Sequence, residues 1–176
     1  QRCCPPRGEK KARAVRALAQ SSQSSPSAPN ANDAVKQRVV ITGSTRGLGL
    51  ELAKSFLSKG DSVFVTSRDA GKVAETVAAL RTAYGDNVVA GLEADVSRAE
   101  SVQELADACV DAFGGVDMWI NNAGSNGYQY ENLEDADPSV LEQVVLTNSL
   151  GSILCTRQAI RTIKQTSGRG HIFNME

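Results

Sequence analysis

Short apolar runs and longer stretches of helical periodicity alternate along this chain from residue 38 onward. The short runs are rich in β-branched residues, as the strands of a sheet that is buried on both faces are. They predict strands at residues 38–42, 62–67, 87–94, 116–120 and 171–175.

Between these runs, apolar residues recur every three or four positions, which is the spacing of one helix face. This pattern predicts helices at residues 48–59, 73–84, 97–113 and 138–166. Ser97 and Glu100 fit a capping box, and Asp137 followed by Pro138 fits an N-cap with proline in the first turn. Strands that alternate with helices imply right-handed βαβ units. We therefore predict an α/β fold: a Rossmann-like, doubly wound parallel sheet, truncated after its fifth strand.

The first 32 residues differ from the rest in charge, since they carry six basic side chains and one acidic one, within a net charge of −1 for the chain. Arg-rich, Ser-rich and acid-poor composition is typical of an organelle transit peptide, and a disordered polar linker is the alternative. We expect residues 1–35 to be a disordered, transit-peptide-like tail and residues 36–176 to form the domain. A basic tail on an acidic body does not indicate a nucleic-acid enzyme.

The cysteines do not indicate a disulfide framework or a metal site. Two of the four, Cys3 and Cys4, lie in the tail, and Cys109 and Cys155 each fall within a helical pattern. The chain has one histidine and no Cys-x-x-Cys motif. We therefore expect reduced thiols and no metal. No apolar run approaches the ~18–20 residues needed to span a bilayer.

A glycine-rich turn joins the first predicted strand to the first predicted helix, with glycines at positions 43, 47 and 49. Glycines allow a sharp turn and a close approach of the backbone to a pyrophosphate, and the helix start offers free N–H groups and a positive dipole end. The sequence therefore predicts a dinucleotide site here.

The end of the second strand indicates which dinucleotide is bound. NAD sites place an acid about 20 residues after the glycines, whereas this chain has Ser67 and Arg68 there. A guanidinium can pair with a 2′-phosphate, and Arg46 in the glycine turn adds a second cation. Two solvated arginines are the alternative, and Asp69 is an acid close by. We expect NADP(H).

Three polar features follow later strands or lie in the last helix. Asp95 could bond an adenine amino group or simply cap a turn, and residues 121–124 could line the cofactor cleft or form an Asn/Gly turn. Asn148 interrupts an apolar helical stripe, which suggests a local irregularity or a bound water, because Asn competes for backbone hydrogen bonds.

Together these residues resemble the short-chain dehydrogenase/reductase family over residues 39–175. The motifs that carry the resemblance are Thr42-Gly43-x-x-x-Gly47-x-Gly49, Asp95, Asn121-Asn122-Ala123-Gly124 and Asn148-x-x-Gly151.

The resemblance implies a role for each matching position. Gly43, Ser44, Arg46, Gly47, Leu48 and Gly49 would hold the pyrophosphate and neighbouring groups. Ser67 and Arg68 would hold the 2′-phosphate, and Asp95 and Val96 the adenine. Asn121, Ala123 and Gly124 would line the nicotinamide-side ribose region. Asn148 would be the first member of the catalytic tetrad, holding a water in a proton relay.

Within the family, the stretches 39–49, 119–124, 151–157 and 170–175 look like the chlorophyll b reductases of plants and algae, and the last two are the more discriminating. That likeness implies NADPH-dependent reduction of the 7-formyl group of chlorophyll b to 7-hydroxymethyl, as part of chlorophyll b degradation. It also implies a chloroplast location, in the stroma or peripherally at the thylakoid surface, and a homo- or hetero-oligomer for the full-length protein.

One family feature does not appear in the chain. No tyrosine is followed four residues later by lysine, and the family's catalytic Ser, Tyr and Lys lie after the fifth strand. We expect the chain to be a fragment of a reductase that is inactive alone. The alternatives are another plastid short-chain reductase, such as a 3-oxoacyl reductase, or a non-catalytic NADP-binding regulatory protein.

Overall fold

Five parallel strands form the sheet at the centre of this chain in a computed structural model, which describes residues 36–127 and 132–175. The tail predicted for residues 1–35 lies outside the described residues. The strands are β1 (Arg38–Thr42), β2 (Ser62–Ser67), β3 (Val89–Glu93), β4 (Met118–Asn121) and β5 (His171–Asn174), and their order across the sheet is β3-β2-β1-β4-β5. Every neighbouring pair is parallel. This arrangement confirms the predicted Rossmann-like sheet.

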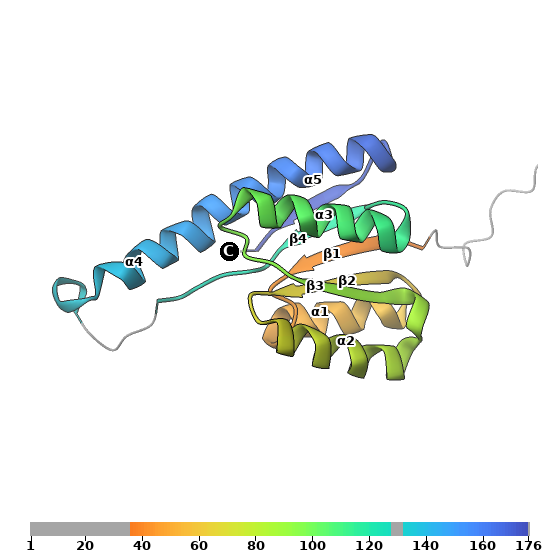
Figure 1. Cartoon of the computed structure of the whole chain (residues 1–176), viewed down its shortest axis with the longest axis horizontal. Helices are drawn as coiled ribbons and strands as arrows, with labels where there is room; N and C mark the ends of the chain where they lie inside the picture. The colour runs from red at the N-terminus through yellow and green to blue at the C-terminus, as the bar shows by residue number, and fades with distance from the viewer. Residues whose placement is uncertain (1–35, 128–131, 176) are drawn as a thin grey trace, which may run out of the picture. The chain divides into compact units, whose positions relative to one another are not determined.

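Helices cover both faces of the sheet (Figure 1). The helices α1 (Gly47–Ser58) and α2 (Ala70–Tyr84) lie on one face, and α3 (Ala99–Phe113) and α5 (Ser152–Thr166) lie on the other. The strand β1 supplies both cores because its side chains alternate: Val39 and Ile41 pack with α1 and α2, whereas Val40 packs with α3 and α5. All three are fully buried, as expected for a strand at the centre of a parallel sheet.

The strand order places a topological switch point at β1, which has β2 on one side and β4 on the other. The chain runs outward from β1 to β2 and β3 and then returns to β4 on the other side. Loops that leave β1 and β4 therefore separate toward opposite faces and leave a crevice at the carboxyl ends of the two strands.

The opposite ends of β1 and β4 are joined by an ion pair. Arg38 Nε donates to Asp117 Oδ2 and Arg38 Nη2 donates to Asp117 Oδ1, both at 2.7 Å. Arg38 also donates from Nη2 to Ser167 Oγ at 2.8 Å. The hydrogen bond from Arg38 lowers the pKa of Asp117 from its usual 3.8 to about 2.

Several predicted boundaries shift for local reasons. The third strand begins at Val89, not at residue 87, because Asp86–Val88 form a 3₁₀ turn after Gly85. The fourth strand begins two residues later than predicted, since the Val116 amide donates to Thr166 Oγ1 (3.3 Å) and not to a neighbouring strand. The fifth strand ends at Asn174, although the Met175 amide still donates to the Asn121 carbonyl.

The predicted capping box before α3 is wrong. Asp95 Oδ1 accepts hydrogen bonds from both the amide and the hydroxyl of Ser97, so that Asp95 orients this side chain within the turn that precedes the helix. The helix begins after Arg98, which provides no side-chain cap. The prediction for Asp137 and Pro138 is confirmed: Asp137 accepts from the Ser139 amide, and Pro138 is the first residue of α4 (Pro138–Val145).

The last predicted helix is interrupted. A π-helical turn, η3 (Leu146–Gly151), separates α4 from α5 and contains Asn148, which confirms the local irregularity expected there. A further 3₁₀ turn, η2 (Leu133–Asp135), precedes α4. Over the described ranges, none of the helices is both long and apolar enough to cross a membrane.

Candidate cofactor-binding site

Two of the three glycines that follow β1 lie too close to neighbouring atoms to accept a side chain. Gly43 has a φ of +65°, and a Cβ there would lie 2.9 Å from the Cα of Ala123. A Cβ on Gly49 would lie 2.5 Å from both Asn122 Nδ2 and the Gly43 carbonyl oxygen. Gly47 has a φ of +54° but an open environment, with no atom within 4 Å of an added Cβ. Two glycines are therefore required by packing and one by its backbone conformation alone.

Hydrogen bonds hold the loop that follows β4 directly against the end of β1. Thr42 Oγ1 accepts from the amides of Asn122 (3.0 Å) and Ala123 (2.9 Å). Asn122 Nδ2 donates back to the carbonyls of Thr42 (2.9 Å) and Gly43 (3.1 Å). The loop that follows β4 is thus held directly against the glycine turn, and the pair forms one rigid wall of the crevice.

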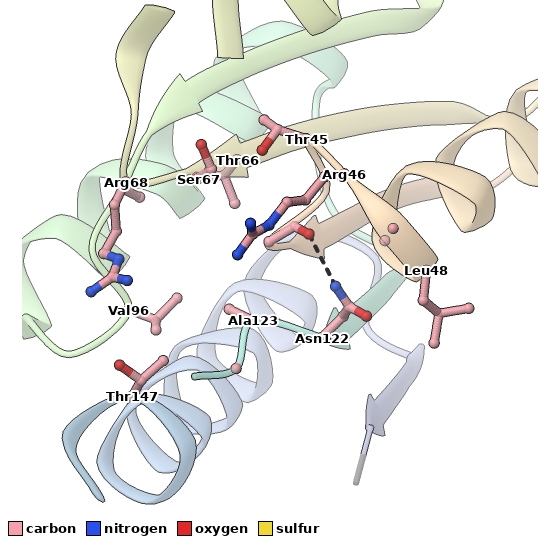
Figure 2. A pocket seen from close by; sticks show the side chains of 15 residues that line it. Thr45, Arg46, Leu48, Thr66, Ser67, Arg68, Val96, Asn122, Ala123 and Thr147 are labelled. Atoms are coloured by element: carbon pink, nitrogen blue, oxygen red, sulfur yellow. Dashed lines mark hydrogen bonds between the residues drawn. The ribbon is translucent and has the colours of Figure 1, made fainter. Parts of the chain in front are cut away.

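A cavity of about 330 Å³ opens at this point, between the glycine turn, the end of β2, the loop after β3 and the loop after β4 (Figure 2). Arg46 and Arg68 come from different loops and both line it. None of the described residues that line this cavity is acidic. The first helix begins at its edge with no side-chain cap and no acid in its first turn, so its amides and dipole are available to an anion.

The acid near the end of β2 is engaged elsewhere. Asp69 is the N-cap of α2, where its carboxylate accepts from the Lys72 amide (3.0 Å) and pairs with Lys72 Nζ (3.4 Å). The hydrogen bond from the Lys72 backbone lowers the pKa of this carboxyl. Ser67 Oγ exchanges hydrogen bonds at 3.3 Å with the backbone of Asp69. These bonds fix the turn from which Arg68 projects toward the cavity (Figure 2).

A second cavity, of about 730 Å³, adjoins the first and shares five lining residues with it. Its remaining walls come from the loop after β4, the π turn and the end of β5, and they include Ser125, Asn148, Ser152, Asn174 and Met175. A ligand longer than a mononucleotide can therefore extend from the glycine turn into this space. The Asn148 amide is held there by two hydrogen bonds of 2.8 Å with the backbone of Ser125.

Most of the predicted site residues meet in the first cavity. Its lining includes Gly43, Arg46, Gly47, Leu48, Gly49, Ser67, Arg68, Val96, Ala123 and Gly124. Asn148 lines the second cavity.

Three predicted residues lie behind the cavity surface. The buried Ser44 donates from Oγ to the Ile41 carbonyl (2.7 Å) and accepts from the Thr66 amide (3.0 Å), so it joins β1 to β2. Asp95 is held by Ser97, and Asn121 is buried among side chains of β4, β5 and α5.

Asn122, within the stretch 121–124 that was expected to line the cleft, also lines this cavity. Sequence reasoning did not identify four other lining residues, namely Thr45, Thr66, Ala94 and Thr147. Each is adjacent in sequence to a predicted site residue, and that adjacency was the available signal. Thr66 Oγ1 is, among the described side chains, the one buried N or O atom without a hydrogen-bond partner. Buried polar atoms normally have a hydrogen-bond partner, so this unpaired hydroxyl beside the cavity is consistent with a polar ligand that supplies one.

The switch-point crevice, the glycine turn and the uncapped helix together define a dinucleotide-binding Rossmann domain. The model of the short chain dehydrogenase family matches residues 37–176. The chain therefore belongs to the short-chain dehydrogenase family.

Curated relatives include two chloroplast proteins of rice and Arabidopsis. The chain is 42% identical over 138 residues to chlorophyll(ide) b reductase NOL, chloroplastic, of Oryza sativa subsp. japonica, which covers 78% of this chain and 40% of that protein. It is 41% identical over 155 residues to the probable chlorophyll(ide) b reductase NYC1, chloroplastic, of Arabidopsis thaliana, with 80% and 31% covered. The chain thus spans less than half the length of these relatives.

Solved structures show the same fold. A short chain dehydrogenase/reductase from Burkholderia phymatum in complex with NAD has a TM-score of 0.70 and 32% identity, over 77% of this chain and 47% of that one. A 3-ketoacyl-(acyl-carrier-protein) reductase from Brucella melitensis complexed with NADH has a TM-score of 0.69 and 30% identity, over 77% and 55%.

Proposed function

We propose that this chain is the NADP(H)-binding part of a short-chain reductase that reduces the 7-formyl group of chlorophyll b to 7-hydroxymethyl. Residues 36–176 are the cofactor-binding domain in this proposal, and residues 1–35 are a chloroplast targeting segment. The observation that carries the cofactor assignment is the pair Arg46 and Arg68, which line one cavity beside the glycine turn with no acid among its described lining residues.

The side chains that line the first cavity favour NADP(H) over NAD(H). A 2′-phosphate carries close to two negative charges, and guanidinium groups bind it with charge-assisted hydrogen bonds. A carboxylate at the same position would repel the phosphate and bind ribose hydroxyls instead. Because Asp69 is the cap of α2 and pairs with Lys72, its carboxylate does not face the cavity, and Arg68 is left to recognise the phosphate.

The remaining residues divide between holding the cofactor and supporting the reaction. Gly43, Gly47 and Gly49 let the pyrophosphate approach the start of α1, Val96 contacts the adenine side, and Ala123 and Gly124 contact the nicotinamide-side ribose. Ser44, Asp95 and Asn121 act from behind these walls. The nicotinamide, when bound, supplies hydride to a carbonyl carbon. Asn148 lies beyond it in the second cavity, where it would hold the water of a proton relay.

The substrate assignment rests on the relatives. Two of them are named as chlorophyll(ide) b reductases and as chloroplastic. We therefore place the protein in the chloroplast, and we propose that the full-length protein is an oligomer that meets its pigment peripherally at the thylakoid surface.

Titration of the chain with NADPH and NADH, followed by nicotinamide fluorescence, tests the cofactor assignment. Wild type should prefer NADPH. Arg68→Ala should weaken NADPH binding by about 10- to 100-fold, the loss expected for a hydrogen-bonded charge pair, and leave NADH binding unchanged. Arg161→Ala is the matched control, since Arg161 is exposed on α5 and lines neither cavity. Equal affinity for the two dinucleotides in wild type would contradict the proposal.

A second candidate substrate is a 3-oxoacyl thioester, which is favoured by the structural likeness to the Brucella 3-ketoacyl reductase. Competition between chlorophyllide b and acetoacetyl thioester for the NADP⁺-loaded chain separates the two. Saturable binding of the thioester together with none of the pigment would overturn the chlorophyll assignment and retain the cofactor assignment.

A further inference from the structure

A chain of hydrogen bonds runs beneath the second cavity from β4 to β5. Asn121 and Asn174 are register partners at the carboxyl ends of these two strands. Trp119 Nε1 donates to Asn121 Oδ1 at 2.9 Å, and Asn121 Nδ2 donates to Asn174 Oδ1 at 2.8 Å. The side chain of Trp119 is fully buried and Asn121 is 4% exposed, so the bond between them is shielded from water, whereas Asn174 is exposed at the end of β5.

The chemistry of these groups fixes which way each amide faces. An indole N–H can only donate, so it requires the oxygen of Asn121. The Asn121 NH₂ group must then face Thr156 Oγ1 (2.9 Å) and Asn174. Because a donor arrives there, Asn174 must turn its oxygen inward, where it also accepts from Thr156 Oγ1 at 3.4 Å. One buried tryptophan thus sets the orientation of two asparagines.

The result is an amide donor turned away from the protein. With Asn174 Oδ1 held inward, its Nδ2 lies on the other side of the amide, and Asn174 lines the second cavity. No hydrogen bond within residues 36–127 and 132–175 uses this Nδ2. The neighbouring Asn148 differs, because Ser125 engages both atoms of its amide.

We propose that Asn174 Nδ2 donates a hydrogen bond to a carbonyl oxygen of the ligand in the second cavity, and that Trp119 and Asn121 are the positioning residues that aim it. The inference rests on the proposed function. That function brings two carbonyl oxygens near this cavity, the carboxamide of nicotinamide and the formyl group of the pigment. Both offer the same acceptor to the donor, and two matched ligand pairs distinguish them.

The test measures affinities of the intact chain for ligands with and without each carbonyl. NADPH is compared with 2′-phospho-ADP-ribose, which lacks nicotinamide, and chlorophyllide b is compared with chlorophyllide a, which carries methyl in place of formyl. Asn174→Ala should lower the affinity for one carbonyl-bearing ligand by about 3- to 10-fold relative to its partner, the loss of one neutral hydrogen bond. The pair that responds identifies the carbonyl.

Two further variants separate binding from structure. Asn174→Asp keeps an inward oxygen for Asn121 and Thr156 but has no outward donor, so the same ratio should fall while the melting temperature stays near that of wild type. Asn121→Asp keeps the bond from Trp119 and turns an oxygen toward Asn174, whose amide must then rotate and withdraw Nδ2 from the cavity. Asn121→Asp should therefore lower the same affinity ratio as Asn174→Ala, although residue 174 itself is unchanged. Asn87→Ala is the matched control, an exposed asparagine that precedes β3 at the opposite edge of the sheet.

The outcomes are distinct. If wild type fails to bind 2′-phospho-ADP-ribose, the proposed function is wrong. If wild type binds it and both affinity ratios stay unchanged in Asn174→Ala and Asn174→Asp, the proposed function survives and this inference is overturned.

Discussion

Asn148 and Ser125 hold each other through a closed pair of hydrogen bonds: the Ser125 amide donates to Asn148 Oδ1, and Asn148 Nδ2 donates to the Ser125 carbonyl, both at 2.8 Å. The pair joins the π turn to the loop that follows β4. Asn148 lies within a turn that contains one more residue than an α-helical turn, and such turns are frequent at functional sites. The π turn and the cofactor crevice are therefore mechanically connected through one side chain.

Asn148→Ala should loosen this connection. Both hydrogen bonds are lost, and because the site is exposed the cost to the free energy of unfolding should be about 1 kcal/mol. The more specific effect is faster hydrogen exchange at the Ser125 amide, measured by NMR. Ser149→Ala, an exposed neighbour on the same turn, is the control. Unchanged protection of Ser125 in Asn148→Ala would show that the pair does not order the loop.

The glycines of the turn after β1 should differ in their tolerance of alanine. A Cβ at position 49 meets Asn122 Nδ2 and the Gly43 carbonyl at 2.5 Å, whereas at position 47 it meets nothing within 4 Å. Gly49→Ala should cost about 2–3 kcal/mol, as overpacking does. Gly47→Ala should cost about 1 kcal/mol, from its positive φ alone. Urea denaturation measures both, and an equal or larger loss in Gly47→Ala would contradict the packing argument.

The sequence predicted the sheet well because periodicity and β-branched runs report burial directly, as the alternation of Val39, Val40 and Ile41 between two cores shows. The glycine turn and Arg68 were also predictable, because their spacing follows from the geometry of one βαβ unit. Whether a motif side chain faces the cavity or the protein interior was not predictable from the sequence. Ser44 and Asn121 carry motif positions yet face inward, since the pairing with β2 orients Ser44, and Trp119 and the neighbouring strand β5 orient the amide of Asn121.

The capping box failed for a related reason. The carboxylate of Asp95 accepts from both the amide and the hydroxyl of Ser97 and orients that side chain within the turn, and the helix begins only after Arg98. Thr147 lines the cavity because it lies in the π turn, and the loop after β4 is held in place by bonds to Thr42, a residue about 80 positions away. Local patterns do not contain this information.

The two cysteines of the described helices should be inert in the native state. Cys109 and Cys155 are buried, and burial raises the pKa of each thiol from 9.0 to about 12. At pH 8 about one molecule in 10⁴ would carry the reactive thiolate. A Cys3→Ser/Cys4→Ser variant should therefore react with Ellman's reagent only in step with unfolding. Rapid modification at pH 8 without denaturant would contradict the burial of these thiols.

Acid should release the ion pair at the start of β1. The hydrogen bond from Arg38 lowers the pKa of Asp117 to about 2, so the folded state holds the proton less tightly than the unfolded chain does. The stabilisation is fully present above the unfolded pKa, near 4, and it is lost as pH falls from about 4 to about 2. With side chains that are 28% and 18% exposed, solvent screening reduces the pair to about 1–2 kcal/mol.

Asp117→Asn isolates this contribution from the other carboxyl groups of the chain. The variant keeps the shape of the side chain but has no charge to lose, so it should be less stable than wild type by about 1–2 kcal/mol at pH 6. At pH 2.5 this carboxyl is protonated in the unfolded chain and still partly ionised in the folded protein, so most of the stabilisation is lost and the difference between the two proteins should shrink. Urea midpoints at the two pH values measure it. A stability difference that is the same at both would show that Asp117 acts through its shape and hydrogen bonds and not through its charge.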